Sequence, residues 1–182
     1  MNKILKCMGY DERKRKLKKL INEQNPKPTL VLDIDHTLLI RKFTSTGEII
    51  LYRPYLDEFL EAMAELYNIV LFSHGKREYV QSLTKKMDPN GRIFKAIFTR
   101  NDCDYIGYNS PVKDLSKLHV NLNKTILIDD TPNYAGLQPN NFITIKRFYG
   151  ESNDNALLVV SKIRKDLINY SDFTDYVKEL KT

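Results

Sequence analysis

The sequence predicts an α/β protein with a Rossmann-like, three-layer fold, in which a central parallel sheet lies between layers of helices. Two observations carry this prediction. Short runs of aliphatic and β-branched residues recur along the chain, as is typical of strands buried on both faces. Segments with helical spacing of apolar residues separate these runs, and strands that alternate with helices favour a parallel sheet.

The expected elements follow in chain order. The first strand is Leu30–Asp33, and LLIRKF and EIILYR around the turn TSTG form a β-hairpin flap after it. PYLDEFLEAMAELYN is expected to be a helix, because Pro54 suits a first turn and apolar residues then recur with helical spacing. The later strands are IVLF, KAIF, TILID and FITI. The later helices are REYVQSLTKKM, one opened by VKDLSKL, NALLVVSKIRKDL and DFTDYVKEL.

The 182 residues fit one domain with an N-terminal extension. NPKP marks the expected boundary, which makes residues 1–25 a basic helical extension and residues 26–182 the domain. The net charge is +6, from 29 basic and 23 acidic residues, and much of the excess lies in RKRKLKK, Arg13 to Lys19. This run fits a solvated helix face, a nuclear-import signal or a patch for acidic or phosphorylated partners, and all three stay open.

Membrane association is not expected, because the sequence has no apolar run long enough for a membrane span and no signal-peptide pattern. Cys7 and Cys103 have no motif spacing, and we expect both to be reduced thiols. We therefore expect an intracellular protein. The nucleus is the first expectation for its location and the cytoplasm is the alternative.

Side chains that carry chemistry follow the expected strands at the edge where these strands end. Ligands of parallel α/β sheets bind at the carboxyl ends of the strands, so we expect these side chains to share one crevice. A lysine at the expected start of a helix, shortly before the last of these strands, completes the set. The members are Asp33, Asp35, Ser73, Lys113, Asp129 and Asp130.

Such a set suits Mg²⁺ and a phosphoryl group, because neighbouring carboxylates need a cation between them and Mg²⁺ prefers oxygen ligands. Asp33 is the candidate nucleophile that forms an aspartyl-phosphate, and Asp35 is the candidate acid and base. The expected metal ligands are Asp33, Asp35, Asp130 and Asp129.

Three further residues have expected roles near the phosphoryl group. Ser73 and Lys113 are expected to bind its equatorial oxygens, where charge must be stabilised. Thr37 is expected to hold the loop or Asp35 by hydrogen bonding.

The motifs DIDHT, LFS, VKDLS and LIDDTP occur in the order of the four motifs of the haloacid-dehalogenase superfamily, and the chain resembles that superfamily. More narrowly, YRPYLDEFLEAMAELYNIVLFS and VKDLSKL…ILIDDTPNYAGLQPNNFITIKRFYG look like small phosphatases of the NLI-interacting-factor type, which act on the C-terminal domain of RNA polymerase II. The resemblance covers Thr29 to Leu167. It implies a Mg²⁺-dependent phosphoserine and phosphothreonine protein phosphatase. The leading partner is a phosphopeptide of the polymerase tail, and no direct contact with nucleic acid is expected.

The resemblance also implies roles residue by residue. It places the family's nucleophile on Asp33, its acid and base on Asp35, its phosphate-binding hydroxyl on Ser73, its lysine on Lys113 and its metal-binding side chain on Asp130. In this family the backbone carbonyl of the second aspartate also binds Mg²⁺.

Three other positions match family residues that contact the peptide. Arg100 matches a peptide-binding arginine, and Phe43 and Tyr79 match aromatic residues that line a proline pocket. The hairpin after Asp35 is shorter than in family members whose pocket selects serine-proline sites. The resemblance therefore does not carry that preference over to this chain.

The spacing of the motifs leaves no room for a cap domain, which superfamily members that act on small metabolites usually carry. Thr37 to Ser73 spans 36 positions and Ser73 to Lys113 spans 40, and expected strands and helices already fill both intervals. We therefore expect an open crevice that admits a phosphorylated chain. Two alternatives remain, a catalytically silent binding or scaffold protein of the same fold and a phosphatase of the same superfamily with another substrate.

Overall fold

The computed structural model describes residues 27–181. The expected basic extension, the boundary at residues 25 and 26, the RKRKLKK run and Cys7 lie outside the described residues. Cys103 is a free, buried thiol, as expected. No helix in the described part of the chain is long and apolar enough to cross a membrane.

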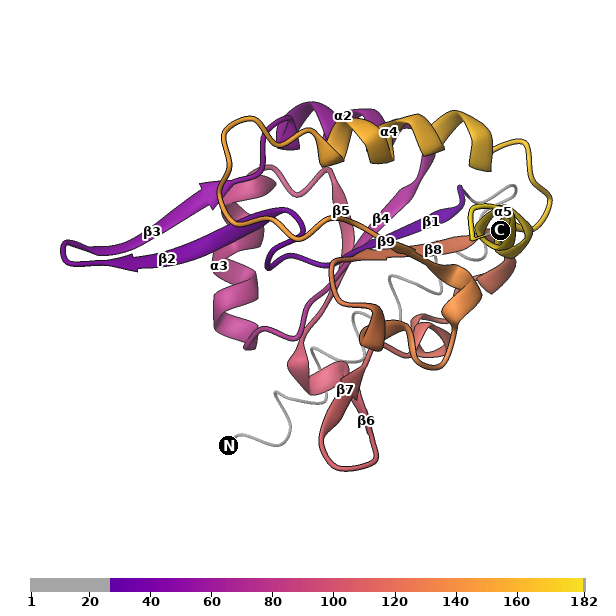
Figure 1. The fold of residues 1–182 in the computed structure, drawn as a ribbon, viewed down its shortest axis with the longest axis horizontal. Helices are drawn as coiled ribbons and strands as arrows, with labels where there is room; N and C mark the ends of the chain where they lie inside the picture. Colours follow the sequence, from indigo (N-terminus) through magenta and orange to yellow (C-terminus); the bar gives the residue numbers. More distant parts are fainter. Residues whose placement is uncertain (1–26, 182) are drawn as a thin grey trace.

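A five-stranded parallel sheet forms the centre of the protein, with strand order β5-β4-β1-β8-β9 (Figure 1). Strand β1 lies in the middle, where Leu32 pairs with Leu71 of β4 on one side and with Ile128 of β8 on the other. The residues that follow β1 therefore emerge between the ends of two neighbouring strands. The strands are β1 (Thr29–Leu32), β4 (Asn68–Phe72), β5 (Phe94–Phe98), β8 (Thr125–Asp129) and β9 (Phe142–Thr144).

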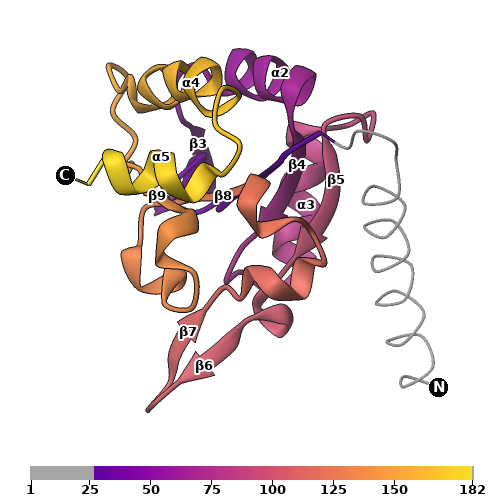
Figure 2. The same cartoon turned by 90° about the vertical axis from the view of Figure 1, so that its right-hand side faces the viewer.

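The two faces of the sheet are covered differently. The face that carries Leu30 and Leu32 packs against apolar side chains of all four described α-helices. Figure 2 shows α2 and α4 side by side over this face. The four helices are α2 (Leu56–Leu66), α3 (Arg77–Met87), α4 (Ala156–Leu167) and α5 (Phe173–Glu179).

The opposite face, which carries Val31 and Val70, is covered by short 3-10 helices and the loops between them. The expected three layers are therefore present, with 3-10 helices in place of α-helices in one of them. Three of these short helices contribute apolar side chains to this face, η2 (Leu115–Leu118), η3 (Leu122–Lys124) and η4 (Pro132–Ala135). The other two described 3-10 helices are η1 (Arg100–Asp102) and η5 (Pro139–Asn141).

Two β-hairpins project from the body in different directions (Figure 1). The expected flap is confirmed as β2 (Leu39–Thr44) and β3 (Gly47–Tyr52). A second hairpin, β6 (Asp104–Ile106) and β7 (Ser110–Val112), was not expected from the sequence.

Two expectations about helices were wrong in detail. VKDLSKL does not open an α-helix, because η2 has only four residues and ends at His119, whose φ of 54° is left-handed. The helix after the flap begins at Leu56, so Pro54 lies before it and not in its first turn.

No cap domain is present within residues 27–181. The interval from Thr37 to Ser73 holds β2, β3, α2 and β4, and the interval from Ser73 to Lys113 holds α3, β5, η1 and the second hairpin. The expectation of an uncapped fold is therefore confirmed for the described part of the chain.

Candidate active site

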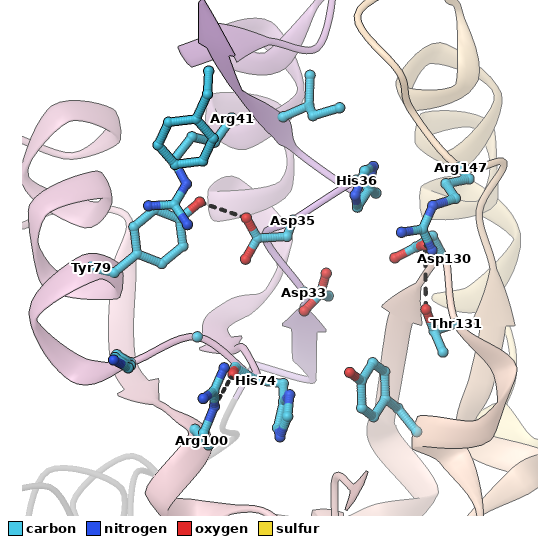
Figure 3. Close-up of a pocket in the computed structure, with 15 residues that line it drawn as sticks. Asp33, Asp35, His36, Arg41, His74, Tyr79, Arg100, Asp130, Thr131 and Arg147 are labelled. Carbon is cyan, nitrogen blue, oxygen red and sulfur yellow. Dashed lines mark hydrogen bonds and ion pairs between the residues drawn. The ribbon is translucent and has the colours of Figure 1, made fainter. Parts of the chain in front are cut away.

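The carboxyl ends of the central strands open into a pocket of about 550 Å³ (Figure 3). Six of the ten predicted site residues line it, and the other four are buried. The lining residues are Asp33, Asp35, Phe43, Tyr79, Arg100 and Asp130. The buried residues are Thr37, Ser73, Lys113 and Asp129.

Lys113 provides the cation between the buried carboxylates. Its Nζ lies 2.6 Å from Asp33 Oδ1 and 2.5 Å from Asp129 Oδ2, and all three side chains are almost inaccessible to water. Burial alone would lower the pKa of Lys113, but the charges of Asp33 and Asp129 outweigh burial and raise it. The lysine is therefore a permanent ammonium beside Asp33.

Asp129 is engaged within the protein through both carboxylate oxygens. Oδ2 accepts from Lys113, and Oδ1 accepts from the backbone N–H of Thr131 at 2.8 Å. Burial and then the charge of Asp33 raise the pKa of Asp129, while Lys113 opposes them. Asp129 does not line the pocket, so its position suits holding the lysine in place.

Asp35 lies beside Tyr79 at the wall of the pocket. The Tyr79 hydroxyl donates to Asp35 Oδ1 at 2.5 Å (Figure 3). Burial raises the pKa of Asp35, and the hydrogen bond from Tyr79 only partly opposes this, so the net shift is upward. A carboxyl group with a raised pKa keeps its proton to higher pH, which suits a general acid.

Thr37 and Ser73 support the site from beneath. Thr37 Oγ1 accepts from the backbone N–H of Asp130 at 3.2 Å, so this threonine links the loop after β1 to the loop after β8. Ser73 Oγ accepts from the backbone N–H of Gly75 at 2.9 Å, which leaves its O–H free as a donor. A Cβ at Gly75 would lie only 2.9 Å from Val80, so the close turn after Ser73 requires glycine.

Arg53 also holds the loop after β1, which contains Thr37. The sequence analysis did not identify this arginine. Its guanidinium is buried, bonds Asp154 through Nε at 2.7 Å and Nη2 at 3.0 Å, and donates to the Thr37 carbonyl at 2.9 Å. A third link runs to the Lys146 carbonyl at 2.6 Å. No local pattern marks this arginine, because its partners are distant in the sequence.

Basic side chains surround the pocket mouth, and only Arg100 among them was predicted. Arg147 Nη1 lies 2.7 Å from Asp130 Oδ2, and Arg100 Nε donates to the His74 carbonyl at 2.8 Å. Arg41 and Lys76 also line the pocket. The strand pattern of the flap predicted the element that carries Arg41 but not the pocket that it faces.

Phe43 and Tyr79 both line the pocket, and the guanidinium of Arg41 lies close to both rings. Arg41 Cζ is 5.0 Å from the ring centroid of Phe43 and 4.5 Å from that of Tyr79. The resemblance assigns these two rings to a proline pocket. In this structure Arg41 packs against both of them instead.

Carboxylate oxygens of Asp33, Asp129 and Asp130 lie within 4.8 Å of one another, so the described residues offer a candidate metal site. Asp33 and Asp130 line the pocket, although Arg147 pairs with Asp130 Oδ2, whereas Asp129 does not line the pocket and both of its oxygens are bonded within the protein. Hard oxygen donors with one or two carboxylates match the ligand preference of Mg²⁺. The residues present fit this ion.

Comparisons with known proteins identify the family of the chain. The model of the family "NLI interacting factor-like phosphatase" matches residues 28–174. The human carboxy-terminal domain RNA polymerase II polypeptide A small phosphatase 2 is 29% identical over 172 residues, which cover 86% of this chain and 63% of the human protein. The CTD small phosphatase-like protein 2 of Dictyostelium discoideum is 28% identical over 85% of this chain and 30% of its own length.

This chain spans between about one third and two thirds of the length of these relatives. Among solved structures, Fcp1, described as an essential RNA polymerase II CTD phosphatase, has a TM-score of 0.58 at 16% identity. That match covers 90% of this chain and 52% of Fcp1, and it shows that the two share a fold. With the family model matched over most of its residues, the chain belongs to the family of NLI interacting factor-like phosphatases.

Proposed function

We propose that this chain is a Mg²⁺-dependent phosphoprotein phosphatase that hydrolyses phosphoserine or phosphothreonine through an aspartyl-phosphate on Asp33. The observation that carries this proposal is the pairing of Asp33 with the buried Lys113 at the floor of an open pocket, with Asp35 on the pocket wall. Family membership supports the reaction class.

In the first step, the oxygen of Asp33 that is not bonded to Lys113 attacks phosphorus. A new P–O bond forms while the bond from phosphorus to the serine or threonine oxygen breaks. Asp35 gives its proton to the leaving oxygen, so an alcohol departs and not an alkoxide. Asp35 then takes a proton from water, which attacks the aspartyl-phosphate and releases inorganic phosphate and free Asp33.

Lys113 and Ser73 are the donors for the transferring phosphoryl group. The ammonium of Lys113 is held in place by two carboxylates, so it needs no rearrangement as negative charge moves from Asp33 toward the phosphoryl and leaving oxygens. Ser73 keeps its O–H available because its oxygen already accepts from Gly75.

Asp33 and Asp130 are the side chains proposed to hold Mg²⁺, together with the backbone carbonyl of Asp35. When bound, Mg²⁺ supplies positive charge beside the phosphoryl oxygens. Asp129, which the sequence analysis also included among the ligands, is proposed to act through Lys113. The basis for this change is that Asp129 does not line the pocket and that Lys113 and Thr131 bond its two oxygens.

The proposed substrate is a phosphorylated chain segment. The pocket has no cap in the described residues, its mouth is basic, and Phe43 is 74% exposed beside it. A basic, open mouth with exposed apolar area fits an anionic chain better than a small metabolite. Since relatives bear names that refer to the polymerase C-terminal domain, a phosphopeptide of that tail is the leading candidate. An intracellular, nuclear location follows from this proposal, and no contact with nucleic acid is part of it.

The test measures phosphate release from phosphoserine peptides of the polymerase tail, from p-nitrophenyl phosphate, and from sugar and nucleotide monophosphates at matched Mg²⁺. We expect kcat/KM to be higher for the phosphopeptides than for the other substrates. Peptide hydrolysis should stop when EDTA is added and should be lost in Asp33→Asn. Asp175→Asn, on the exposed side of α5, is the matched control and should match the wild type.

Equal activity of Asp33→Asn and the wild type would contradict the mechanism. A sugar or nucleotide phosphate that is hydrolysed far better than every phosphopeptide would contradict the substrate class. Binding of phosphopeptides without any hydrolysis would favour the alternative of a catalytically silent binding protein.

A further inference from the structure

We propose that Arg41, held between Phe43 and Tyr79, forms a second anion-binding subsite for a second phosphate or a carboxylate on the substrate chain, near the target phosphoserine. This inference rests on the proposed function, because it assigns the subsite to the same phosphopeptide. It adds a specificity determinant that neither the catalytic residues nor the predicted peptide contacts include.

The flap presents Arg41 to the pocket and leaves its neighbour Lys42 outside. Residues two apart on a strand point to the same face, so Arg41 and Phe43 share one face of β2. Both line the pocket. Lys42 lies on the other face, where its Nζ approaches Gly150.

The two aromatic rings fix the guanidinium without using its hydrogen-bond donors. Arg41 Cζ lies 4.5 Å from the Tyr79 centroid and 5.0 Å from the Phe43 centroid, within the range of cation–π contact. Cation–π contacts do not consume the N–H donors of a guanidinium, so these donors stay available for the oxygens of phosphate or carboxylate. The rings therefore prepare Arg41 for an anion.

Arg41 forms only a weak ion pair within the protein. Glu48, across the hairpin, lies 3.5 Å from Arg41 Nη1, and the two side chains are 41% and 38% exposed. An exposed pair of this kind contributes at most about 1 kcal/mol. A phosphate, with more charge and more acceptor oxygens, can therefore replace Glu48.

The subsite adjoins the reacting groups through Tyr79. The ring of Tyr79 packs on Arg41, and its hydroxyl donates to Asp35 at 2.5 Å. A phosphoserine placed for attack by Asp33 and protonation by Asp35 thus has Arg41 beside it. The other two pocket arginines are more firmly engaged, Arg147 by Asp130 at 2.7 Å and Arg100 by a backbone carbonyl at 2.8 Å.

The test compares kcat/KM for a phosphoserine peptide with neutral flanks and for versions with a second phosphoserine, or a glutamate, at each of the nearest positions on either side. The wild type is expected to favour the best doubly anionic peptide by about 10-fold, which equals about 1.4 kcal/mol. This preference should shrink as NaCl is raised, because the subsite is exposed. Arg41→Gln should bring the ratio of the two kcat/KM values close to one.

Two further variants on the flap sharpen the result. Lys42→Gln removes the same charge from the opposite face and should keep the wild-type ratio. Glu48→Gln removes the competing carboxylate and should raise the ratio by about twofold. A general loss of folding or catalysis lowers both kcat/KM values together and does not move their ratio.

A wild-type ratio near one at every position, or an unchanged ratio in Arg41→Gln, would overturn the subsite while leaving the phosphatase intact. If the wild type hydrolyses no peptide, the proposed function fails and fluorescence anisotropy of the same labelled peptides decides the subsite. Tighter binding of the acidic peptide that is lost in Arg41→Gln would then support the subsite, and equal affinities would overturn it.

Discussion

The floor of the pocket holds its charges away from water, whereas the rim exposes its charges to solvent. We define the floor as Asp33, Ser73, Lys113 and Asp129, and the rim as Arg41, Phe43, Lys76, Arg100 and Arg147. In the floor, Lys113 and the two carboxylates are at most 7% exposed and lie within 2.6 Å of their partners. On the rim, Arg147 is 44% exposed and Phe43 is 74% exposed.

This difference separates two tasks. Charges interact far more strongly where water is excluded, so the floor can hold one geometry for one reaction. Rim charges are screened and can exchange partners at a low free-energy cost. We infer that the floor carries the chemistry and that the rim carries the choice of substrate.

The largest expected effect tests the floor. Lys113→Met leaves Asp33 and Asp129 as neighbouring buried carboxylates without a counter-charge. We expect the free energy of unfolding to fall by roughly 3–5 kcal/mol, measured by urea titration. We expect kcat/KM for a phosphopeptide to fall by about 100-fold or more, because a preorganised donor is lost.

Two comparisons separate stability from chemistry in this prediction. Lys117→Met removes an exposed lysine, paired with Asp104 at about 40% exposure, and should cost less than about 1 kcal/mol. The double variant Lys113→Met/Asp129→Leu also removes one of the two carboxylates that lack a counter-charge. Its free energy of unfolding should therefore be higher than that of Lys113→Met, while its kcat/KM stays low. Recovery of activity in the double variant would show that the floor acts only as a structural element.

An intermediate effect is expected at Asp130, where the floor meets the rim. Asp130→Ala removes a proposed ligand and should raise the Mg²⁺ concentration for half-maximal activity by about 10-fold or more. Arg147→Gln should lower that concentration, because the arginine occupies Asp130 Oδ2 at 2.7 Å and competes with the ion. Activity titrations with Mg²⁺ measure both shifts, and an unchanged requirement in Asp130→Ala would move the ligand role to Asp129.

The smallest effect is expected at Tyr79, which links the rim to the acid. Tyr79→Phe keeps the ring that packs on Arg41 but loses the hydrogen bond to Asp35. Without this bond the pKa of Asp35 rises further, so the acid keeps its proton but loses the contact that positions it. We expect kcat/KM to fall by up to about 10-fold for a phosphoserine peptide, whose poor leaving group needs a correctly positioned proton donor. p-Nitrophenyl phosphate has a good leaving group and should be affected less.

Tyr108→Phe is the matched control, because Tyr108 is fully exposed between β6 and β7. Equal losses for both substrates in Tyr79→Phe would contradict a role through Asp35. They would indicate instead that the hydroxyl only stabilises the fold.

The floor was predictable from the sequence to a degree that the rim was not. Asp33, Ser73 and Lys113 belong to short motifs at strand ends, and the topology of a parallel sheet brings such ends together. The rim depends on which face of the flap turns inward and on contacts across long stretches of chain. No local sequence pattern indicates that Arg41 packs against two aromatic rings or that Arg147 pairs with Asp130.

The missed elements have a similar explanation. Strands β6 and β7 have three residues each, which is too short to show an apolar period. The segment after Lys113 has apolar residues with helical spacing, but it turns back after four residues of 3-10 helix. Local propensity predicted these segments poorly because tertiary contacts decide them.

The hydrogen bonds of Arg53, which clamp the loop after β1, have a consequence for when the site becomes ordered during synthesis. Arg53 fixes the carbonyl of Thr37, yet its carboxylate partner Asp154 lies 101 residues further along the chain. At ~5–20 residues per second, a ribosome needs roughly 5–20 s to pass from one to the other. Until then the loop that carries Asp33 and Asp35 lacks its clamp. A growing chain therefore acquires an ordered carboxylate cluster only after Asp154 has been synthesised.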